Sequence, residues 1–271
     1  MTPETAPTLK QLLAFYLEAG VDCALTDEPV NRLTDPDIAP APARVEPREA
    51  AAPRTFMQAP AVVPAARGEA ALAPEAAIQS AREAARTAPT LEALRALMDT
   101  FEGCALKSTA TRLVFADGNP QARVMLVGEA PGREEDIEGL PFVGRSGKLL
   151  DRMLAAIGLD RTQVYFANIV PWRPPGNRTP TPVETQICLP FVQRQIELSN
   201  PDVLVTIGQP STGALLGVQG IMKNRGRWFP FQTGTREIRA IPMLHPAYLL
   251  RSPIGKRLAW RDMLAIKKAL G

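Results

Sequence analysis

Four short segments of the 271-residue chain place reactive or binding side chains beside glycine or proline. They read GEAPGREED (128–136), PFVGRSG (141–147), NIVPWRPPGNRTPTP (168–182) and HPAYLLR (245–251). A loop aromatic such as Phe142 can stack on a base, and the amide of Asn168 can read an imide edge with one donor and one acceptor. His245 is the one histidine of the sequence. Together these residue types indicate a pocket for a nucleic-acid base.

Each of these residues also has a structural interpretation. Phe142 can be an ordinary core residue, Asn168 can cap a turn, and a lone histidine such as His245 is more often structural than catalytic. The acids at 134–136 suit a helix N-terminus, where they complement the helix dipole. The GEAPG loop matches neither GxGxxG nor GxxxxGK[ST], so a nucleotide-binding loop is the weaker interpretation.

Contacts with a nucleic-acid backbone are expected from the same loops. Arginines bind phosphates, and two leucines beside an arginine in HPAYLLR supply an apolar wedge that can open a base stack. The residues expected to contact DNA are Arg145, Ser146, Arg173, Arg178, Leu249, Leu250 and Arg251.

The elements that must position these loops alternate between strands and helices. Short apolar runs predict strands at 124–128, 163–170, 202–208 and 237–244, and amphipathic runs predict helices at 147–159, 183–199 and 257–270. Pro190 should kink or split the second helix. The pattern predicts a three-layer α/β/α fold with a central four-stranded parallel sheet. Ligands of such sheets lie beyond the carboxyl ends of the strands, so the polar loops, with GQPS (208–211), should converge on one crevice.

The N-terminal third has a different composition. Within residues 1–38, the spacing of apolar residues predicts a short amphipathic helix at 8–20, and residues 39–88 hold 19 Ala and 7 Pro. The prolines favour a semi-extended linker, with a helix continuing from Pro74 to about Arg86. We expect the α/β domain to span 89–271, with residues 1–88 free to contact a partner.

Charge and composition exclude several classes of protein. The net charge is +3, but residues 1–87 carry 8 Lys+Arg against 12 Asp+Glu and residues 88–271 carry 23 against 16. A basic domain suits a polyanion. No stretch predicts a membrane span or a secretory signal. The three cysteines, Cys23, Cys104 and Cys188, are too far apart for a disulfide framework, which favours a reducing cytoplasm. We expect a monomer.

The four segments, in this order and at this spacing, resemble the uracil-DNA glycosylase superfamily, most closely the family 4 type. The resemblance covers roughly 100–271 and implies the glycosylase fold and excision of uracil from DNA in base-excision repair. It implies that the flipped uracil stacks on Phe142 and that Asn168 reads its edge. Gly128, Glu129 and Ala130 would line the pocket.

The resemblance also implies catalytic roles. His245 would stabilise the uracil anion as the N-glycosidic bond breaks, and Glu135 would position water. Ala130 stands where another family of the superfamily has a water-activating Asp, so catalysis should depend on leaving-group stabilisation. No lysine stands at a motif position, and no histidine follows the PFVG segment, so neither lyase chemistry nor covalent trapping of DNA is expected. The alternative is a DNA-binding or partner-recruiting protein that has lost activity on the same fold.

One departure from family 4 concerns a cofactor. The resemblance to family 4 implies an iron–sulfur cluster held by four cysteines. The four corresponding positions of this chain are Phe101, Cys104, Trp172 and Cys188. Two thiolates cannot hold a cluster that needs four, and Cys23 lies too far upstream to help. We therefore expect no cofactor, with the two aromatic rings filling the volume beside two buried thiols.

Overall fold

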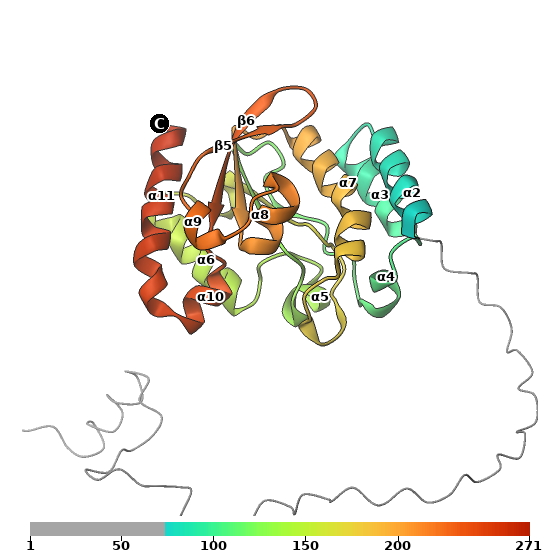
Figure 1. The fold of residues 1–271 in the computed structure, drawn as a ribbon, viewed down its shortest axis with the longest axis horizontal. Helices are drawn as coiled ribbons and strands as arrows, with labels where there is room; N and C mark the ends of the chain where they lie inside the picture. Colours follow the sequence, from blue (N-terminus) through green and yellow to red (C-terminus); the bar gives the residue numbers. More distant parts are fainter. Residues whose placement is uncertain (1–73) are drawn as a thin grey trace, which may run out of the picture. The chain divides into compact units, whose positions relative to one another are not determined.

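Four parallel strands form the centre of the computed structural model, which describes residues 74–271. They are β2 (Val124–Gly128), β3 (Val164–Asn168), β4 (Val203–Ile207) and β6 (Glu237–Met243), in the order β3-β2-β4-β6. Figure 1 shows the sheet in the middle of the domain, with helices around it. The predicted parallel sheet is confirmed. The helix expected at 8–20, Cys23 and the proline-rich stretch up to residue 73 lie outside the described residues.

Two short antiparallel strands extend this sheet to six strands, so a four-stranded sheet was an incomplete prediction. β1 (Asp117–Gly118) pairs with β3, and β5 (Phe229–Gln232) pairs with β6. β1 has two residues, and β5 contains Pro230, which lacks a backbone donor and is tolerated at a sheet edge. Neither has the length or the apolar run that marks a buried strand.

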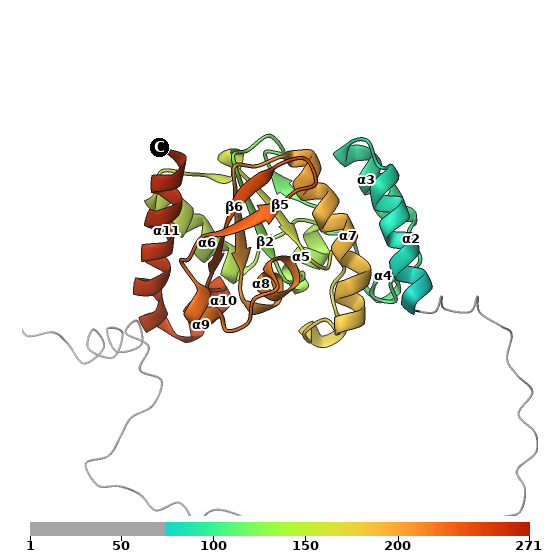
Figure 2. The same ribbon diagram turned by 45° about the horizontal axis from the view of Figure 1, so that its top comes forward.

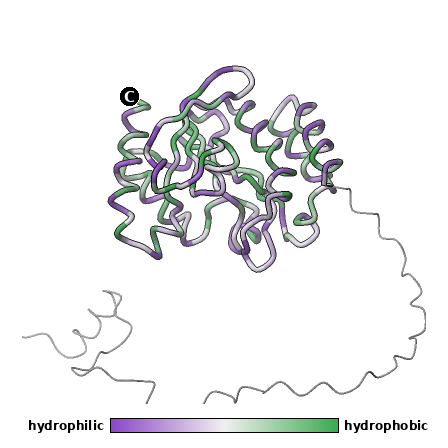
Figure 3. The backbone as a smooth tube through the Cα atoms, viewed as in Figure 1, coloured by the Kyte–Doolittle hydropathy of each residue, from purple (hydrophilic) through white to green (hydrophobic). Residues whose placement is uncertain are grey.

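Helices cover both faces of the sheet because neighbouring strand residues point to opposite sides. Met125 and Val127 pack with the helices of the face that carries α7 (Pro182–Ser199), whereas Val124 and Leu126 pack with α6 (Arg145–Ala156) and α11 (Lys256–Leu270). Figures 1 and 2 show α7 on one side of the sheet and α6 and α11 on the other. The strands carry much of the hydrophobic colour in Figure 3.

The remaining elements are short connections and caps. They are α3 (Leu91–Thr100), α4 (Leu106–Thr109), α5 (Arg133–Glu138), α8 (Gln209–Leu216), α9 (Ile221–Asn224), α10 (Pro246–Arg251) and the 3₁₀ turns η1 (Arg161–Gln163), η2 (Pro175–Asn177) and η3 (Pro253–Gly255). Pro190 does not split α7, which runs through it as one helix. Within residues 74–271, no helix combines the length and the apolar character needed to cross a membrane.

The domain begins earlier than residue 89. Helix α2 (Pro74–Thr87) confirms the helix predicted after Pro74, but it is not part of a linker. Ala77, Ala81 and Ala85 are buried in the same core as residues of α3 and α7. Figure 2 shows the three helices side by side. Small side chains let α2 approach α7 closely, which a count of bulky apolar residues does not reveal.

The strand register places the polar loops at one edge. Gly128 at the end of β2 pairs with Asn168 at the end of β3, and Ile207 of β4 pairs with Met243 of β6. The segments that follow these residues therefore leave the sheet side by side, as expected from the sequence.

Candidate active site

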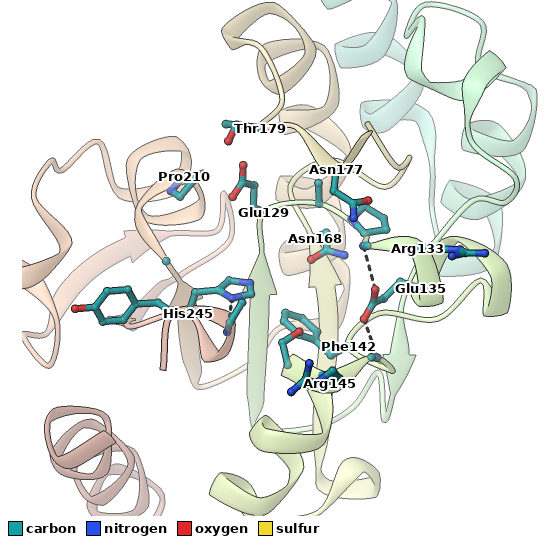
Figure 4. Close-up of a pocket in the computed structure, with 18 of the residues that line it drawn as sticks. Glu129, Arg133, Glu135, Phe142, Arg145, Asn168, Asn177, Thr179, Pro210 and His245 are labelled. Carbon is teal, nitrogen blue, oxygen red and sulfur yellow. Dashed lines mark hydrogen bonds between the residues drawn. The ribbon is translucent and has the colours of Figure 1, made fainter. Parts of the chain in front are cut away.

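A cavity of about 770 Å³ lies at this edge of the sheet (Figure 4). All four motif loops line it, together with the GQPS loop after β4, so the predicted convergence is confirmed. Of the residues expected in the site, those that line the cavity are Glu129, Ala130, Glu135, Phe142, Arg145, Ser146, Asn168, Arg178, His245, Leu250 and Arg251.

Phe142 and Asn168 meet above Gly128. A Cβ atom on Gly128 would lie 2.6 Å from the Phe142 ring and 2.5 Å from Asn168 Oδ1, so only glycine fits between them. Asn168 is 6% exposed, and no hydrogen bond within residues 74–271 uses its side-chain amide. A buried amide without a protein partner beside an aromatic ring is suited to pair with a planar ligand.

His245 has a defined tautomer. It caps the N-terminus of α10, and its Nδ1 accepts a hydrogen bond of 3.1 Å from the backbone N–H of Ala247. Burial first, and the charge of Arg251 second, lower the pKa of His245 from 6.5 to about 4. The ring is therefore neutral at physiological pH, and its proton is on Nε2, which can donate to a ligand. The ring lies 6.3 Å from that of Phe142, centroid to centroid.

Glu135 ties two walls of the cavity together. Its Oε1 accepts from the N–H of Gly144 (2.9 Å) and its Oε2 from the N–H of Gly132 (3.0 Å), as the dashed lines in Figure 4 show. Glu135 is buried, and this bridge fixes the GEAPG loop against the PFVGR loop. Each carboxylate oxygen keeps a second lone pair, so positioning of water by Glu135 stays a prediction.

Glu129 is the second carboxyl group of the cavity. Burial raises its pKa, and a hydrogen bond with Thr179 partly offsets this effect. Its backbone carbonyl accepts from the N–H of Val170, which joins the β2 and β3 loops. The oxygens of this carboxyl group can accept hydrogen bonds from a bound base.

Comparison with known proteins agrees with this geometry. The model of the Uracil DNA glycosylase superfamily matches residues 115–264. The chain belongs to the uracil-DNA glycosylase superfamily. It is 38% identical to the Type-4 uracil-DNA glycosylase of Sulfurisphaera tokodaii over 185 residues, 66% of this chain and 84% of that protein. It is 44% identical to the Type-4 uracil-DNA glycosylase of Thermotoga maritima over 153 residues, 55% of this chain and 77% of that protein.

A more distant relative is the Type-5 uracil-DNA glycosylase of Thermus thermophilus. It is 32% identical over 132 residues, 43% of this chain and 58% of that protein. The resemblance drawn from the four motifs is thus confirmed at the level of the superfamily.

Three residues expected in the glycosylase site do not line the cavity. Gly128, which was expected to line the pocket, is instead packed against the side chains of Phe142 and Asn168. Arg173 Nε donates to Asn177 Oδ1, and its Nη1 lies 3.9 Å from Asp136. Leu249 is fully buried with Leu244 and Ala259, so its assignment to the wedge was wrong. The helical turn of α10 directs Leu249 inward and leaves its neighbour 39% exposed, so a wedge can be formed only by Leu250.

Arg178 lines the cavity but already has a partner. Its guanidinium donates to both carboxylate oxygens of Glu184, at 2.8 and 2.6 Å, and lowers the pKa of Glu184 to about 2. A phosphate would therefore compete with Glu184 for Arg178.

Several lining residues were missed by sequence reasoning. Among them are Arg133, Asn177, Thr179, Gln209, Pro210 and Tyr248. All lie in or next to the loops expected to converge, so their location could be inferred but their side-chain direction could not. Asn177 adopts a positive φ of 55°, which turns the proline-rich loop toward the cavity.

Two aromatic rings and two thiols lie at the four positions where the resemblance to family 4 implies cysteine ligands of an iron–sulfur cluster. Phe101 and Trp172 stack with ring centroids 6.5 Å apart, and Cys188 Sγ lies 3.9 Å from Cys104 Sγ. All four side chains, which we call the aromatic–thiol cluster, are buried in one hydrophobic core. The predicted packing is confirmed. This donor set does not fit a four-thiolate iron–sulfur cluster, and residues 74–271 contain no group of three His, Cys, Asp or Glu arranged to hold a metal.

Proposed function

We propose that this protein excises uracil from DNA by hydrolysis of the N-glycosidic bond and so starts base-excision repair. The observation that carries the proposal is the convergence of Phe142, Asn168 and His245 on one cavity. Stacking, edge recognition and leaving-group stabilisation are the three tasks that excision of a flipped base requires.

Recognition depends on the free amide of Asn168. Its oxygen can accept from uracil N3–H while its NH₂ donates to O4. Cytosine presents the opposite pattern, an acceptor at N3 and a donor at N4, so it would leave both groups unpaired in this orientation of the amide. Unpaired buried groups discriminate strongly between substrates.

Catalysis depends on a neutral His245. As the C1′–N1 bond breaks, its electron pair moves into the base, and negative charge accumulates on O2. The Nε2–H of His245 donates to that oxygen. Water adds to C1′, and the proton that it loses neutralises the uracil anion, so the products are the abasic sugar and neutral uracil. Each 1.4 kcal/mol of anion stabilisation contributes about tenfold in rate. Ala130 provides no base for the water, so we assign its positioning to Glu135.

DNA containing uracil is the partner that this activity requires. We also propose that the protein acts as a monomer. Arg145, Ser146, Arg178 and Arg251 at the rim support phosphate contacts, and Leu250 supports entry into the base stack. We further propose that the aromatic–thiol cluster replaces the cofactor and that the protein works in the cytoplasm at the nucleoid, with residues before 74 contacting a partner.

A single-turnover assay tests the proposal. Purified protein is mixed with an oligonucleotide carrying one uracil, and alkali-labile strand breaks are measured, with the same sequence carrying thymine or cytosine as control. Breaks at uracil alone are the expected result. Binding without breaks would instead support a non-catalytic DNA-binding protein and would direct attention to Ala130.

A further inference from the structure

Phe142 is held in a backbone conformation that it would not adopt alone. Its φ is +56°, in the left-handed region that a bulky side chain rarely occupies. Asn177 and Asn200 are the other residues besides glycine with positive φ in 74–271, and asparagine tolerates this region far better. Such a conformation persists only where the surroundings over-determine it.

Arg161 supplies much of that restraint. This residue begins η1, the turn before β3, and does not line the cavity. Its Nη2 donates to the carbonyl oxygen of Phe142, and its Nη1 lies 3.4 Å from the carbonyl oxygen of Pro141. The guanidinium also lies over the ring of Phe166, 4.9 Å from its centroid, and that ring packs 5.8 Å from the ring of Phe142.

The guanidinium is itself fixed by two carboxylates. Nε donates to Asp151 Oδ1 of α6 at 2.9 Å, and Nη1 donates to Asp117 Oδ2 of β1. The Arg161 side chain is 28% exposed, so these pairs are partly shielded from water. Two carboxylates on separate elements leave the guanidinium one orientation, with its remaining N–H groups aimed at the Phe142 turn.

The N-terminus of α6 completes the restraint on Phe142. A Cβ atom on Gly147 would lie 1.7 Å from the Phe142 carbonyl oxygen, so this carbonyl is in close contact with the first turn of the helix. The carbonyl cannot rotate toward Gly147, and Arg161 holds it from the other side.

We propose that Arg161 is a positioning residue that sets the angle of the Phe142 ring on which the uracil stacks. The inference rests on the proposed function, because it takes Phe142 as the stacking platform. Loss of the Arg161 bond would let the 141–144 turn relax toward negative φ and would tilt the ring. A small misplacement of a group that orients the substrate has a large effect on rate.

The test combines single and double variants in the full chain. Arg161→Lys keeps a cation beside Asp117 and Asp151 but removes the planar fork that also reaches the Phe142 carbonyl. We expect this variant to lower the single-turnover rate on uracil by about 10- to 100-fold. Binding of the same oligonucleotide without uracil should change by less than about twofold, because Arg161 lies outside the DNA-contacting residues. Arg161→Gln should show the same rate loss with a lower melting temperature.

A double-mutant cycle separates positioning from general stability. In a Phe142→Ala background, Arg161→Lys should lower the rate by no more than about twofold, because the ring it orients is gone. Arg194→Lys is the matched control. Arg194 also donates to a backbone carbonyl, that of Ala88, and pairs with Glu197, but it is remote from the cavity. Its rate should equal that of the wild type.

Each proposal fails by a different result. A Phe142→Ala rate equal to wild type would overturn the stacking platform and the proposed site with it. A slow Phe142→Ala together with a wild-type rate for Arg161→Lys would overturn only the positioning role. Equal losses in the two backgrounds, or an equal loss in Arg194→Lys, would show that Arg161 acts through stability.

Discussion

The base pocket, which is the cavity lined by Phe142, Asn168 and His245, and the aromatic–thiol cluster are both assembled from segments far apart in the sequence. They share the loop that follows β3. Asn168 faces the pocket, and Trp172, four residues later, is 2% exposed in the cluster. The pocket keeps polar atoms without protein partners around an open volume, whereas the cluster fills its volume with rings and thiols. The difference indicates that this chain carries its chemistry in the pocket and uses the cluster for stability.

The largest expected effect is on activity and comes from the pocket. Asn168→Ala should lower the single-turnover rate on uracil by about 10⁴-fold, because the buried pairing with the base is lost. The melting temperature should stay at the wild-type value, since the amide makes no hydrogen bond within residues 74–271. A rate within tenfold of wild type would show that Asn168 does not read the base.

The next effect is on stability and comes from the cluster. Trp172→Ala should lower the free energy of unfolding by about 3–5 kcal/mol, because it leaves a cavity against Phe101. Urea unfolding measures this loss, and the single-turnover rate of the folded fraction should be unchanged. Trp228→Ala is the control, since Trp228 is 37% exposed and its loss leaves no enclosed cavity. A rate loss in Trp172→Ala beyond its loss of stability would link the two regions.

A third prediction uses the half-buried histidine, His245. The folded-state pKa of His245 is about 4, below the ordinary 6.5, so the unfolded chain binds a proton more readily. Stability from the neutral ring is complete above pH 6.5 and is lost as the pH falls toward 4, by about 3 kcal/mol in all. Urea unfolding of wild type and His245→Gln at pH 7 and pH 4.5 measures the difference. Parallel pH dependences would argue against a neutral ring.

The smallest effect is expected at a thiol. Burial raises the pKa of Cys188, which keeps it protonated beside Cys104. Cys188→Ala should cost about 1 kcal/mol of stability, as an ordinary buried side chain would, and leave the rate on uracil unchanged. Iron and acid-labile sulfide are measured on the wild type in parallel. Stoichiometric iron in the wild type, together with loss of both iron and fold in Cys188→Ala, would show that the aromatic–thiol cluster binds a metal.

The sequence predicted the parts of the fold that depend on long apolar runs and missed those that depend on small contacts. β2, β3 and β4 are buried along their whole length, and β6 is buried from Ala240 to Met243. Their parallel order follows from alternation with helices. The edge strands β1 and β5 are too short to be recognised. The packing of α2 depends on alanines, whose contribution arises from close approach and not from apolar area.

The same division applies to the site. The strand ends predicted which loops converge, and the motifs predicted Phe142, Asn168 and His245 within them. Whether a side chain at the end of a helix points inward depends on where the helix begins, so Leu249 and Leu250 could not be distinguished. Arg161 lies outside the four motifs, and its hydrogen bond to the Phe142 carbonyl oxygen can be found only from the structure.

The carboxylate bridge of Glu135 has a consequence for how the pocket opens. Gly132 and Gly144 each donate their N–H to one oxygen of the same buried carboxylate. If one loop moves away, the buried carboxylate of Glu135 keeps only one of these two hydrogen bonds, which is unfavourable. The GEAPG and PFVGR loops should therefore open as one cooperative unit. In hydrogen–deuterium exchange, the amides of Gly132 and Gly144 should then share one opening rate, although eleven residues separate them in the chain.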